Sequence, residues 1–272
     1  MKNPLVSVVL PAHNEEKYIG VCIESLLKQS YNPIEIFIVN DGSTDNTAEV
    51  VKKYPVTLLS QKKSGPGAAW NLGMKHAKGK VLMFWASDHI YGENYIKDLI
   101  KPILEGDCVR TLHLKEKIAN KNKLWGRAWG ERDYTSMKDK GVNTASLTLR
   151  EVYEKSGGFD PTKGYADDQS IYHKMGIKAK LIDTDVQHFN PESLKETFAQ
   201  TVWIATSHKH PLLIVLGLPL FPAYAVYKSI KHLRKDPYIH FFWFLPFFYS
   251  VKYLGFFTGA LRKMIFGKVT RI

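Results

Sequence analysis

Residues 5–16 read Leu-Val-Ser-Val-Val-Leu-Pro-Ala-His-Asn-Glu-Glu, and residues 34–45 read Ile-Glu-Ile-Phe-Ile-Val-Asn-Asp-Gly-Ser-Thr-Asp. Each stretch is a short apolar run, typical of a buried strand, that ends abruptly in polar residues that favour turns. In an open α/β sheet, ligands bind beyond the carboxyl ends of the strands. We therefore expect the polar residues that follow both runs to gather at one edge of a sheet: Asn14, Glu15, Asp41 and Asp45.

Strands and helices alternate outward from these two runs. Apolar residues at helical spacing predict a helix between the two strands, with Asn14 as its cap and Glu15 and Glu16 in its first turn. Further strands are expected over 56–59 and 81–85, and further helices over 44–54 and 65–77. This alternation predicts an α/β fold whose largely parallel sheet is flanked by helices. Weaker strand patterns follow over 108–114, 142–149 and 177–182.

The net charge of +12 is concentrated at the C-terminal end of the chain. From Thr201 onward there are ten Lys or Arg residues and a single acid, Asp236. The basic character therefore belongs to a tail and says little about the main domain. The two cysteines, Cys22 and Cys108, give no disulfide framework and fit a reducing compartment.

Two apolar segments, 212–227 and 238–261, lie within the basic tail. A helix that spans a bilayer needs about 20 apolar residues, so the first is short, and the second is interrupted by polar residues and Pro246. A spanning hairpin would put the basic connection on the far side, against the positive-inside tendency. We expect helices in the cytoplasmic-side membrane interface, with basic residues on anionic headgroups. Buried core helices, and one or two spans, are the alternatives. Nucleic acid is not expected, because the aromatic run is too apolar for a solvated stacking platform.

Five motifs lie at the expected strand ends and helix starts. They are VVLPAHNE at 8–15, VNDGSTD at 39–45, GPGAAWNLG at 65–73, ASD at 86–88, and GGFD at 157–160 followed by the acidic pair Asp167-Asp168. In this order they resemble glycosyltransferase family 2, of the GT-A fold, over roughly residues 5–205. The resemblance implies an inverting enzyme that uses a nucleoside-diphosphate sugar. Together with the tail, it implies a membrane-proximal or lipid-linked glycan acceptor, as in polysaccharide or glycolipid biosynthesis.

The resemblance also implies where the donor binds. It assigns Asp41 to the base, and it assigns the first strand's end and the loop after the fourth strand to the rest of the donor site: Pro11, Ala12, His13, Glu15, Ser87 and Asp88. Trp70 stands where the family usually has Arg, so it offers stacking in place of charge, beside Asn71 and a helix N-terminus. The alternative roles are structural: Asp41 as an Asx-turn residue and Glu15 as a first-turn helix acid.

The remaining assignments concern the metal and the base. Asp88 matches the second acid of the family's Asp-x-Asp element, whose first position is Ala86 here. A divalent cation, Mg²⁺ or Mn²⁺, would bind there with the donor phosphates, and His188 matches a position that helps in some relatives. Asp168 is the expected general base and Asp167 the reserve candidate. Structural roles, as lone histidines or helix-cap acids, are the alternatives.

These assignments predict a GT-A domain over 1–205, with a nucleotide-binding half (1–92) and an acceptor-binding half (93–205). Residues 206–272 would form a membrane-associating helical tail at the cytoplasmic face of the cell membrane. A non-catalytic nucleotide-sugar-binding or scaffold protein is the first rival, suggested by Ala86 and Trp70. A nucleotidyltransferase, which would be expected to carry a Gly-rich basic loop after the first strand, and a pure membrane-binding module are the others.

Overall fold

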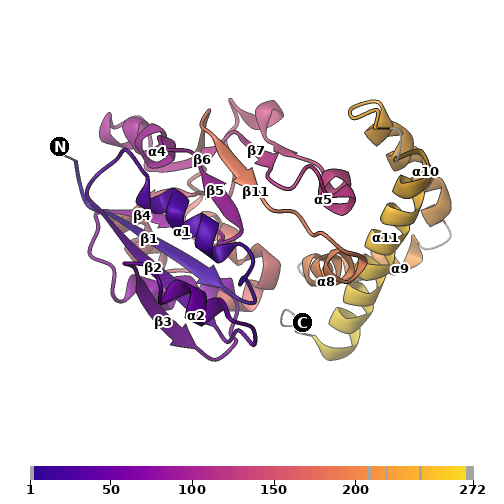
Figure 1. The fold of residues 1–272 in the computed structure, drawn as a ribbon, viewed down its shortest axis with the longest axis horizontal. Helices are drawn as coiled ribbons and strands as arrows, with labels where there is room; N and C mark the ends of the chain where they lie inside the picture. The colour runs from indigo at the N-terminus through magenta and orange to yellow at the C-terminus, as the bar shows by residue number, and fades with distance from the viewer. Residues whose placement is uncertain (1–2, 207–209, 218–219, 239–240, 268–272) are drawn as a thin grey trace. The chain divides into compact units, whose positions relative to one another are not determined.

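The computed structural model describes residues 3–206, 210–217, 220–238 and 241–267 (Figure 1). The chain forms two compact units. Unit 1 comprises Met1–Ala119 and Glu131–Phe189, and unit 2 comprises Asn120–Gly130 and Asn190–Ile272. Unit 2 thus combines a short segment from mid-chain with the C-terminal helices. The functional boundary that the sequence suggests at residue 205 stays a prediction.

Unit 1 is built on a seven-stranded sheet with the strand order β10-β6-β9-β4-β1-β2-β3. Its strands are β1 (Val6–Ala12), β2 (Ile34–Asp41), β3 (Thr57–Gln61), β4 (Val81–Phe84), β6 (Arg110–His113), β9 (Leu147–Leu149) and β10 (Lys180–Ile182). Only β9 runs antiparallel to its neighbours, β4 and β6, among the described strands of this sheet. The predicted α/β fold with a mostly parallel sheet is confirmed.

Helices cover both faces of this sheet. Alternate residues of a strand point to opposite faces, and the apolar side chains on each face are buried under helices. Val8 and Leu10 of β1 pack in one hydrophobic cluster, whereas Val9 between them packs in the other. The first cluster includes α1 (Ile19–Leu27) and α4 (Tyr95–Leu104). The second includes α3 (Pro66–Met74), α6 (Arg150–Ser156) and α7 (Ser170–Met175). Figure 1 shows α1 lying across the sheet on one side.

A second, four-stranded sheet lies beside the first, in the order β5-β11-β7-β8. It is formed by β5 (His89–Tyr91), β11 (Val186–His188), β7 (Lys115–Ile118) and β8 (Arg132–Asp133). Strand β11 pairs antiparallel with β5, and the register places His188 directly opposite His89. This small sheet brings two distant histidines together next to the end of β4.

Three local predictions were wrong. Asn14 does not cap α1, which begins at Ile19; it adopts a left-handed conformation (φ 58°), and its Oδ1 accepts a hydrogen bond from the Thr44 amide. That contact holds the chain after β2 in a loop, so α2 is shorter than expected, at Thr47–Val51. The strand predicted over 142–149 is reduced to β9, and Val142 makes only an isolated bridge with Ala179.

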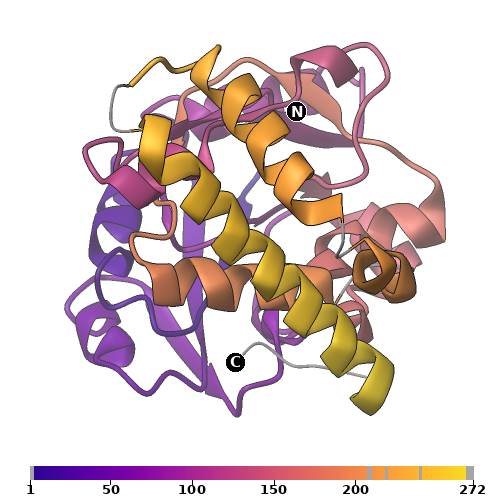
Figure 2. The same cartoon turned by 90° about the vertical axis from the view of Figure 1, so that its right-hand side faces the viewer.

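Unit 2 consists of helices: α5 (Leu124–Trp129), α8 (Leu194–Ala205), α9 (Pro211–Leu216), α10 (Phe221–Leu233) and α11 (Phe241–Phe266). The 26-residue α11 packs against α8, α9 and α10, as Figure 2 shows. Gly255 and Gly259 of α11 face α8 so closely that an added Cβ would collide with Thr201 and Val202. Among the described residues, no helix is both long and apolar enough to cross a membrane.

The aromatic segment of α5 belongs to the core of unit 2. Trp125 packs against Phe244 and Phe248 of α11, with ring centroids 5.0 and 5.8 Å apart. Arg127 forms a two-bond ion pair with Asp236, at 2.7 and 2.6 Å. Both side chains therefore take part in packing and ion pairing within unit 2.

Candidate active site

The loops that follow β1 and β2 interlock at the carboxyl edge of the large sheet. The Nδ1 atom of His13 lies 2.9 Å from the backbone oxygen of Asp41. The Glu15 amide donates to the Thr47 hydroxyl at 2.8 Å, and Oδ1 of Asp45 accepts from the Thr47 amide at 3.0 Å. The predicted gathering of polar residues at one sheet edge is therefore confirmed.

Asp41 is buried, with a side chain that fixes the loop between β3 and α3. Its carboxylate accepts hydrogen bonds from Gln61 Nε2 (2.7 Å), the Ser64 amide (2.8 Å) and the Gly65 amide (2.9 Å). Gly65 has φ 92°, a conformation that residues with a Cβ rarely adopt. The predicted base-binding carboxylate is thus also the residue that shapes the turn into α3.

The end of β4 is tied to the end of β1. The Ser87 hydroxyl donates to the backbone oxygen of Pro11 at 2.8 Å, beside the buried Ala12. This bond brings the Ala86-Ser87-Asp88 element to the same edge as the loops after β1 and β2. The predicted donor residues Pro11, Ala12, His13, Glu15, Asp41, Ser87 and Asp88 therefore share one region of unit 1.

Trp70 and Asn71 of α3 point into the protein. Trp70 is 6% exposed and lies 4.7 Å from the ring of Phe159, and its buried Nε1 has no hydrogen-bond partner among the described residues. Asn71 donates to the Phe159 oxygen at 2.9 Å and accepts from the Phe159 amide and the Tyr153 hydroxyl. Both side chains support the segment around Phe159, and neither presents its polar atoms at an open surface in this structure.

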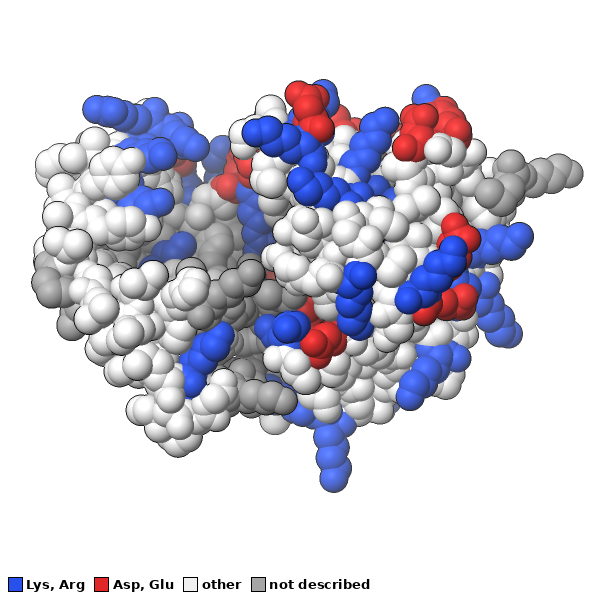
Figure 3. Space-filling view, turned by 180° about the vertical axis from the view of Figure 1, so that it is seen from behind, with Lys and Arg blue, Asp and Glu red and all other residues white. Residues whose placement is uncertain are grey.

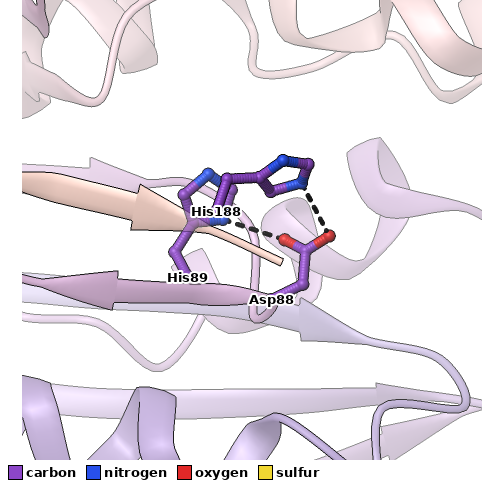
Figure 4. A group of neighbouring side chains, drawn as sticks. All are labelled: Asp88, His89 and His188. Atoms are coloured by element: carbon purple, nitrogen blue, oxygen red, sulfur yellow. Dashed lines mark hydrogen bonds and ion pairs between the residues drawn. The ribbon is translucent and has the colours of Figure 1, made fainter. Parts of the chain in front are cut away.

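The carboxylate of Asp88 bonds to two neighbouring histidines (Figure 4). Its Oδ1 is 2.9 Å from Nδ1 of His89, and its Oδ2 is 3.1 Å from Nε2 of His188. Trp85 Nε1 donates to the far nitrogen of His89 at 3.1 Å and orients that ring. Burial would raise the pKa of Asp88, but the imidazoles of His188 and His89 hold it well below its usual range.

This group of side chains fits a divalent cation. One ligand atom from each of Asp88, His89 and His188 lies within 4.8 Å of the others, which is a compact donor set of one carboxylate and two imidazoles. Mg²⁺ prefers oxygen ligands, whereas imidazole nitrogen suits transition-metal ions. His89 was not among the predicted ligands, because only the register of β5 and β11 places it beside His188.

A buried carboxylate adjoins the histidines and was missed by sequence reasoning. Glu116 of β7 is 1% exposed and bonds to His113 (2.8 Å) and Arg132 (3.0 Å). Burial would raise the pKa of Glu116, but Arg132 and the neighbouring histidines hold it well below its usual range. The alternation Lys-Glu-Lys-Ile at 115–118 was a usable signal, because it places Glu116 on the strand face opposite the flanking lysines.

The two predicted acids of the pair 167–168 lie in different surroundings. They do not open a helix; they lie at the end of the 3-10 helix η2 (Pro161–Gln169), ahead of α7. Oδ2 of Asp167 accepts a hydrogen bond from the Gly67 amide at 2.6 Å. Burial raises the pKa of Asp167 to about 7.

Asp168 has a partly unsatisfied carboxylate. Its Oδ1 is buried without a hydrogen-bond partner among the described residues. Burial raises the pKa of Asp168 to about 6, against the lowering effect of Thr144, Arg132 and Arg110. Arg110 is 1% exposed and donates to backbone oxygens of Ile177 and Asn143. Asp168 is thus an acid whose proton affinity suits exchange near neutral pH.

The sequence is similar to those of known glycosyltransferases. A family model described as "Glycosyl transferase family 2" matches residues 7–159. Glycosyltransferase GlyG of Streptococcus pneumoniae is 39% identical over 110 residues, covering 38% of this chain and 36% of that protein. The uncharacterized glycosyltransferase YibD of Escherichia coli is 33% identical over 156 residues, covering 53% of this chain and 43% of that protein. The chain thus spans well under two thirds of these relatives.

Two solved structures share the fold. The mannosyltransferase PcManGT of Pyrobaculum calidifontis, in complex with GDP-Man and Mn²⁺, superposes with a TM-score of 0.61 at 16% identity, covering 99% of this chain and 89% of that one. Residues 1–349 of S. aureus TarS, in complex with UDP-GlcNAc, superpose with a TM-score of 0.56 at 17% identity, covering 98% and 93%. The similarity in each case is one of fold.

Proposed function

Because the chain belongs to glycosyl transferase family 2, with the match covering residues 7–159, we propose that it is an inverting glycosyltransferase. It moves a sugar from a nucleoside-diphosphate sugar to a hydroxyl group of an acceptor. The observation that carries this proposal is the composition of one sheet edge. The interlocked loops after β1 and β2, the Asp88 group after β4 and the acid Asp168 are all parts of unit 1.

The nucleoside of the donor would bind at the loops after β1 and β2. Asp41 uses two bonds at Oδ1 and one at Oδ2, which leaves an acceptor position at Oδ2 for a base N–H. Structural neighbours bind nucleotide sugars, GDP-Man in one and UDP-GlcNAc in the other, and this supports the same class of donor here. The sugar and the base of this chain's donor are not specified by these contacts.

The diphosphate would bind at the Asp88 group. A divalent cation, Mn²⁺ or Mg²⁺, held by Asp88 and His188 would neutralise charge on the departing nucleoside diphosphate. The Mn²⁺ in the complex of PcManGT supports this class of ion. Arg132 lies within electrostatic range of both His188 and Asp168, so its guanidinium supplies a further positive charge near the reaction, in a chain that has Trp70 where the family usually has Arg.

Asp168 would act as the general base. The acceptor oxygen attacks the anomeric carbon on the face opposite the diphosphate, its proton passes to the Asp168 carboxylate, and the bond from the sugar to the diphosphate breaks. Oδ1 of Asp168, which has no hydrogen-bond partner among the residues that the structure describes, is the atom available for that proton. Asp167 is less suited to the role, because its Oδ2 already accepts from the Gly67 amide.

The acceptor would be a membrane-proximal or lipid-linked glycan, with the protein at the cytoplasmic face of the membrane. The basic and apolar C-terminal region motivates this part of the proposal. The rival function is a non-catalytic nucleotide-sugar-binding protein, which the loss of the first acid of the element at Ala86 favours.

A thermal-shift screen of nucleoside-diphosphate sugars, with and without Mn²⁺, tests the proposal. A ligand at about 100 times its Kd stabilises the folded state by about 2.7 kcal/mol, which gives a measurable rise in Tm. We expect at least one donor to raise the Tm in a Mn²⁺-dependent manner, and Asp88→Ala to remove that dependence. Positive binding without release of nucleoside diphosphate would favour the rival function, and no binding by any donor would contradict the proposal.

A further inference from the structure

Large apolar side chains are exposed in one part of the molecule. Of the nineteen exposed large apolar side chains among the described residues, sixteen belong to unit 2. The most exposed are Phe242 at 78%, Leu220 at 73% and Phe266 at 71%. Monomeric proteins rarely leave such side chains clustered in water, so a concentration of this kind indicates an interaction surface.

Helix α10 divides cleanly into an inner and an outer face. Ala225 and Ser229, one turn apart, are buried. Tyr224, Tyr227 and Ile230, on the other side of the helix, are 48%, 58% and 49% exposed. The helix is therefore apolar on the side that faces solvent, where an ordinary surface helix is polar.

Helix α11 repeats this pattern over most of its length. Phe244 and Phe248 are buried, whereas Trp243, Phe247 and Leu254 are 63%, 49% and 56% exposed. Helices α10 and α11 pack side by side (Figure 2), and each leaves large apolar side chains exposed. With the exposed leucines of α9, these side chains form what we call the outer face of unit 2: Leu212, Leu213, Leu216, Leu220, Tyr224, Tyr227, Ile230, Phe242, Trp243, Phe247 and Leu254.

The charges around this face have one sign. Lys231 and Arg234 are exposed at the end of α10, followed by the exposed Lys235. The single acid after Thr201, Asp236, is neutralised by Arg127. The space-filling view shows unit 2 as a mostly uncharged surface with basic side chains and very few acidic ones (Figure 3).

We propose that the outer face of unit 2 docks on the surface of an anionic phospholipid bilayer, with its aromatic and leucine side chains in the interface and its basic residues on the headgroups. Apolar helix faces flanked by Lys and Arg bind such interfaces by combining area burial with attraction to anionic lipid. A second copy of the chain is a poorer occupant, because two outer faces would oppose like charges. The proposal does not depend on the glycosyl transfer proposed above.

Vesicle flotation with the 272-residue chain tests the docking. The chain should float with vesicles of phosphatidylcholine mixed with phosphatidylglycerol, and much less with phosphatidylcholine alone. Phe242→Gln/Trp243→Gln should lower the affinity about tenfold or more, because two interfacial aromatics are lost. The matched control Val21→Gln/Leu27→Gln alters two side chains of unit 1 that are 42% and 43% exposed, and it should bind as the wild type does.

Charge and folding are tested separately. Lys231→Gln/Arg234→Gln/Lys235→Gln should weaken binding to anionic vesicles by about tenfold or more and remove most of its salt dependence. The five side chains replaced in the aromatic and the basic variants are all exposed, so both variants should fold as the wild type does. Circular dichroism and the Tm of each variant check that the helices are intact. Equal flotation of the aromatic variant and the wild type would overturn the proposal. The proposal would also be overturned if the wild type formed a dimer, the aromatic variant were monomeric, and neither of the two bound vesicles.

Discussion

The carboxylate of Asp167 accepts a 2.6 Å hydrogen bond from the backbone amide of Gly67, a residue 100 positions earlier in the chain. That amide belongs to the first turn of α3, where helix N–H groups have no partner within the helix. The next residue, Asp168, has an Oδ1 atom with no hydrogen-bond partner in the part of the chain that the structure describes. The two adjacent acids thus have different surroundings: Asp167 closes the start of a helix, and Oδ1 of Asp168 is the atom that we propose takes the acceptor's proton.

We expect Asp168→Asn to abolish sugar transfer while donor binding is retained. An amide cannot take the acceptor's proton, and loss of a general base costs about 10²–10⁴ in rate. Steady-state turnover and donor-induced Tm shifts of the variant measure the two properties. Asp167→Asn is the matched control and should keep substantial turnover. Equal loss in both variants would mean that the pair acts structurally.

The base assignment also predicts a pH dependence. Burial raises the pKa of Asp168 to about 6, against Thr144, Arg132 and Arg110, and the base acts only when it is deprotonated. The value of kcat/KM should therefore fall as the pH is lowered through about 6 and level off above it. A profile of kcat/KM against pH, taken under conditions where the protein stays folded, checks this. A flat profile across that value argues against Asp168 as the base.

Asp167 should reduce stability at high pH. Burial raises its pKa from 3.8 to about 7, so between these values the folded state holds a proton that the unfolded state releases, and stability falls as the pH rises. Asp167→Asn can accept the same bond from Gly67 without burying a charge. The variant should be more stable than the wild type at about pH 8, by at most about 4 kcal/mol, and the gain should shrink towards pH 4. Urea unfolding at both pH values measures it, and a pH-independent loss of stability would contradict this account.

The Asp88 group should bind Mn²⁺ in solution. We expect electron paramagnetic resonance to show bound Mn²⁺ in the wild type and at least about tenfold weaker binding in Asp88→Ala and His188→Ala, because even the loss of an outer-shell partner typically costs about 10–100-fold in metal affinity. Ser87→Ala, next in the chain, removes a bond to Pro11 but no proposed ligand, and serves as the control. Unaltered Mn²⁺ binding in Asp88→Ala would place the ion elsewhere.

The effects of Arg132 and Glu116 substitutions on the stability of the fold should depend on each other. Arg132→Gln removes the 3.0 Å ion pair to the buried Glu116, which keeps its contact with His113, so we expect a loss of about 1–3 kcal/mol in stability. The double variant Glu116→Gln/Arg132→Gln should recover much of that loss, because no charge then stays buried alone. If Arg132 also supports the diphosphate, the folded double variant should show a raised KM for the donor. An unchanged KM would limit Arg132 to a structural role.

Local patterns were sufficient to predict the sheet edge. The apolar runs before Pro11 and Asp41 form adjacent parallel strands, and parallel strands must end at the same edge. The helices on both faces followed from the same alternation. The error at Asn14 shows the limit of such patterns. A polar residue before an apolar stretch predicts a cap, whereas the side chain bonds to Thr44, 30 positions away.

The rest of the candidate site depends on contacts between distant segments. His188 lies beside Asp88 only because the short strand β11 pairs with β5, and three-residue strands leave little periodicity in the sequence. The inward orientation of Trp70 follows from its packing on Phe159, which no spacing within α3 reveals. The burial of Glu116 depends likewise on Arg132 from another strand.

The release of nucleoside diphosphate from nucleoside-diphosphate sugars, measured with Mn²⁺ for the wild type, Asp88→Ala and Asp168→Asn, tests the central claim most directly. Our account predicts that the wild type turns over at least one donor, slowly with water and faster with an acceptor, and that both variants lose this activity. Tight donor binding without any release by the wild type, or undiminished release by Asp168→Asn, would contradict it.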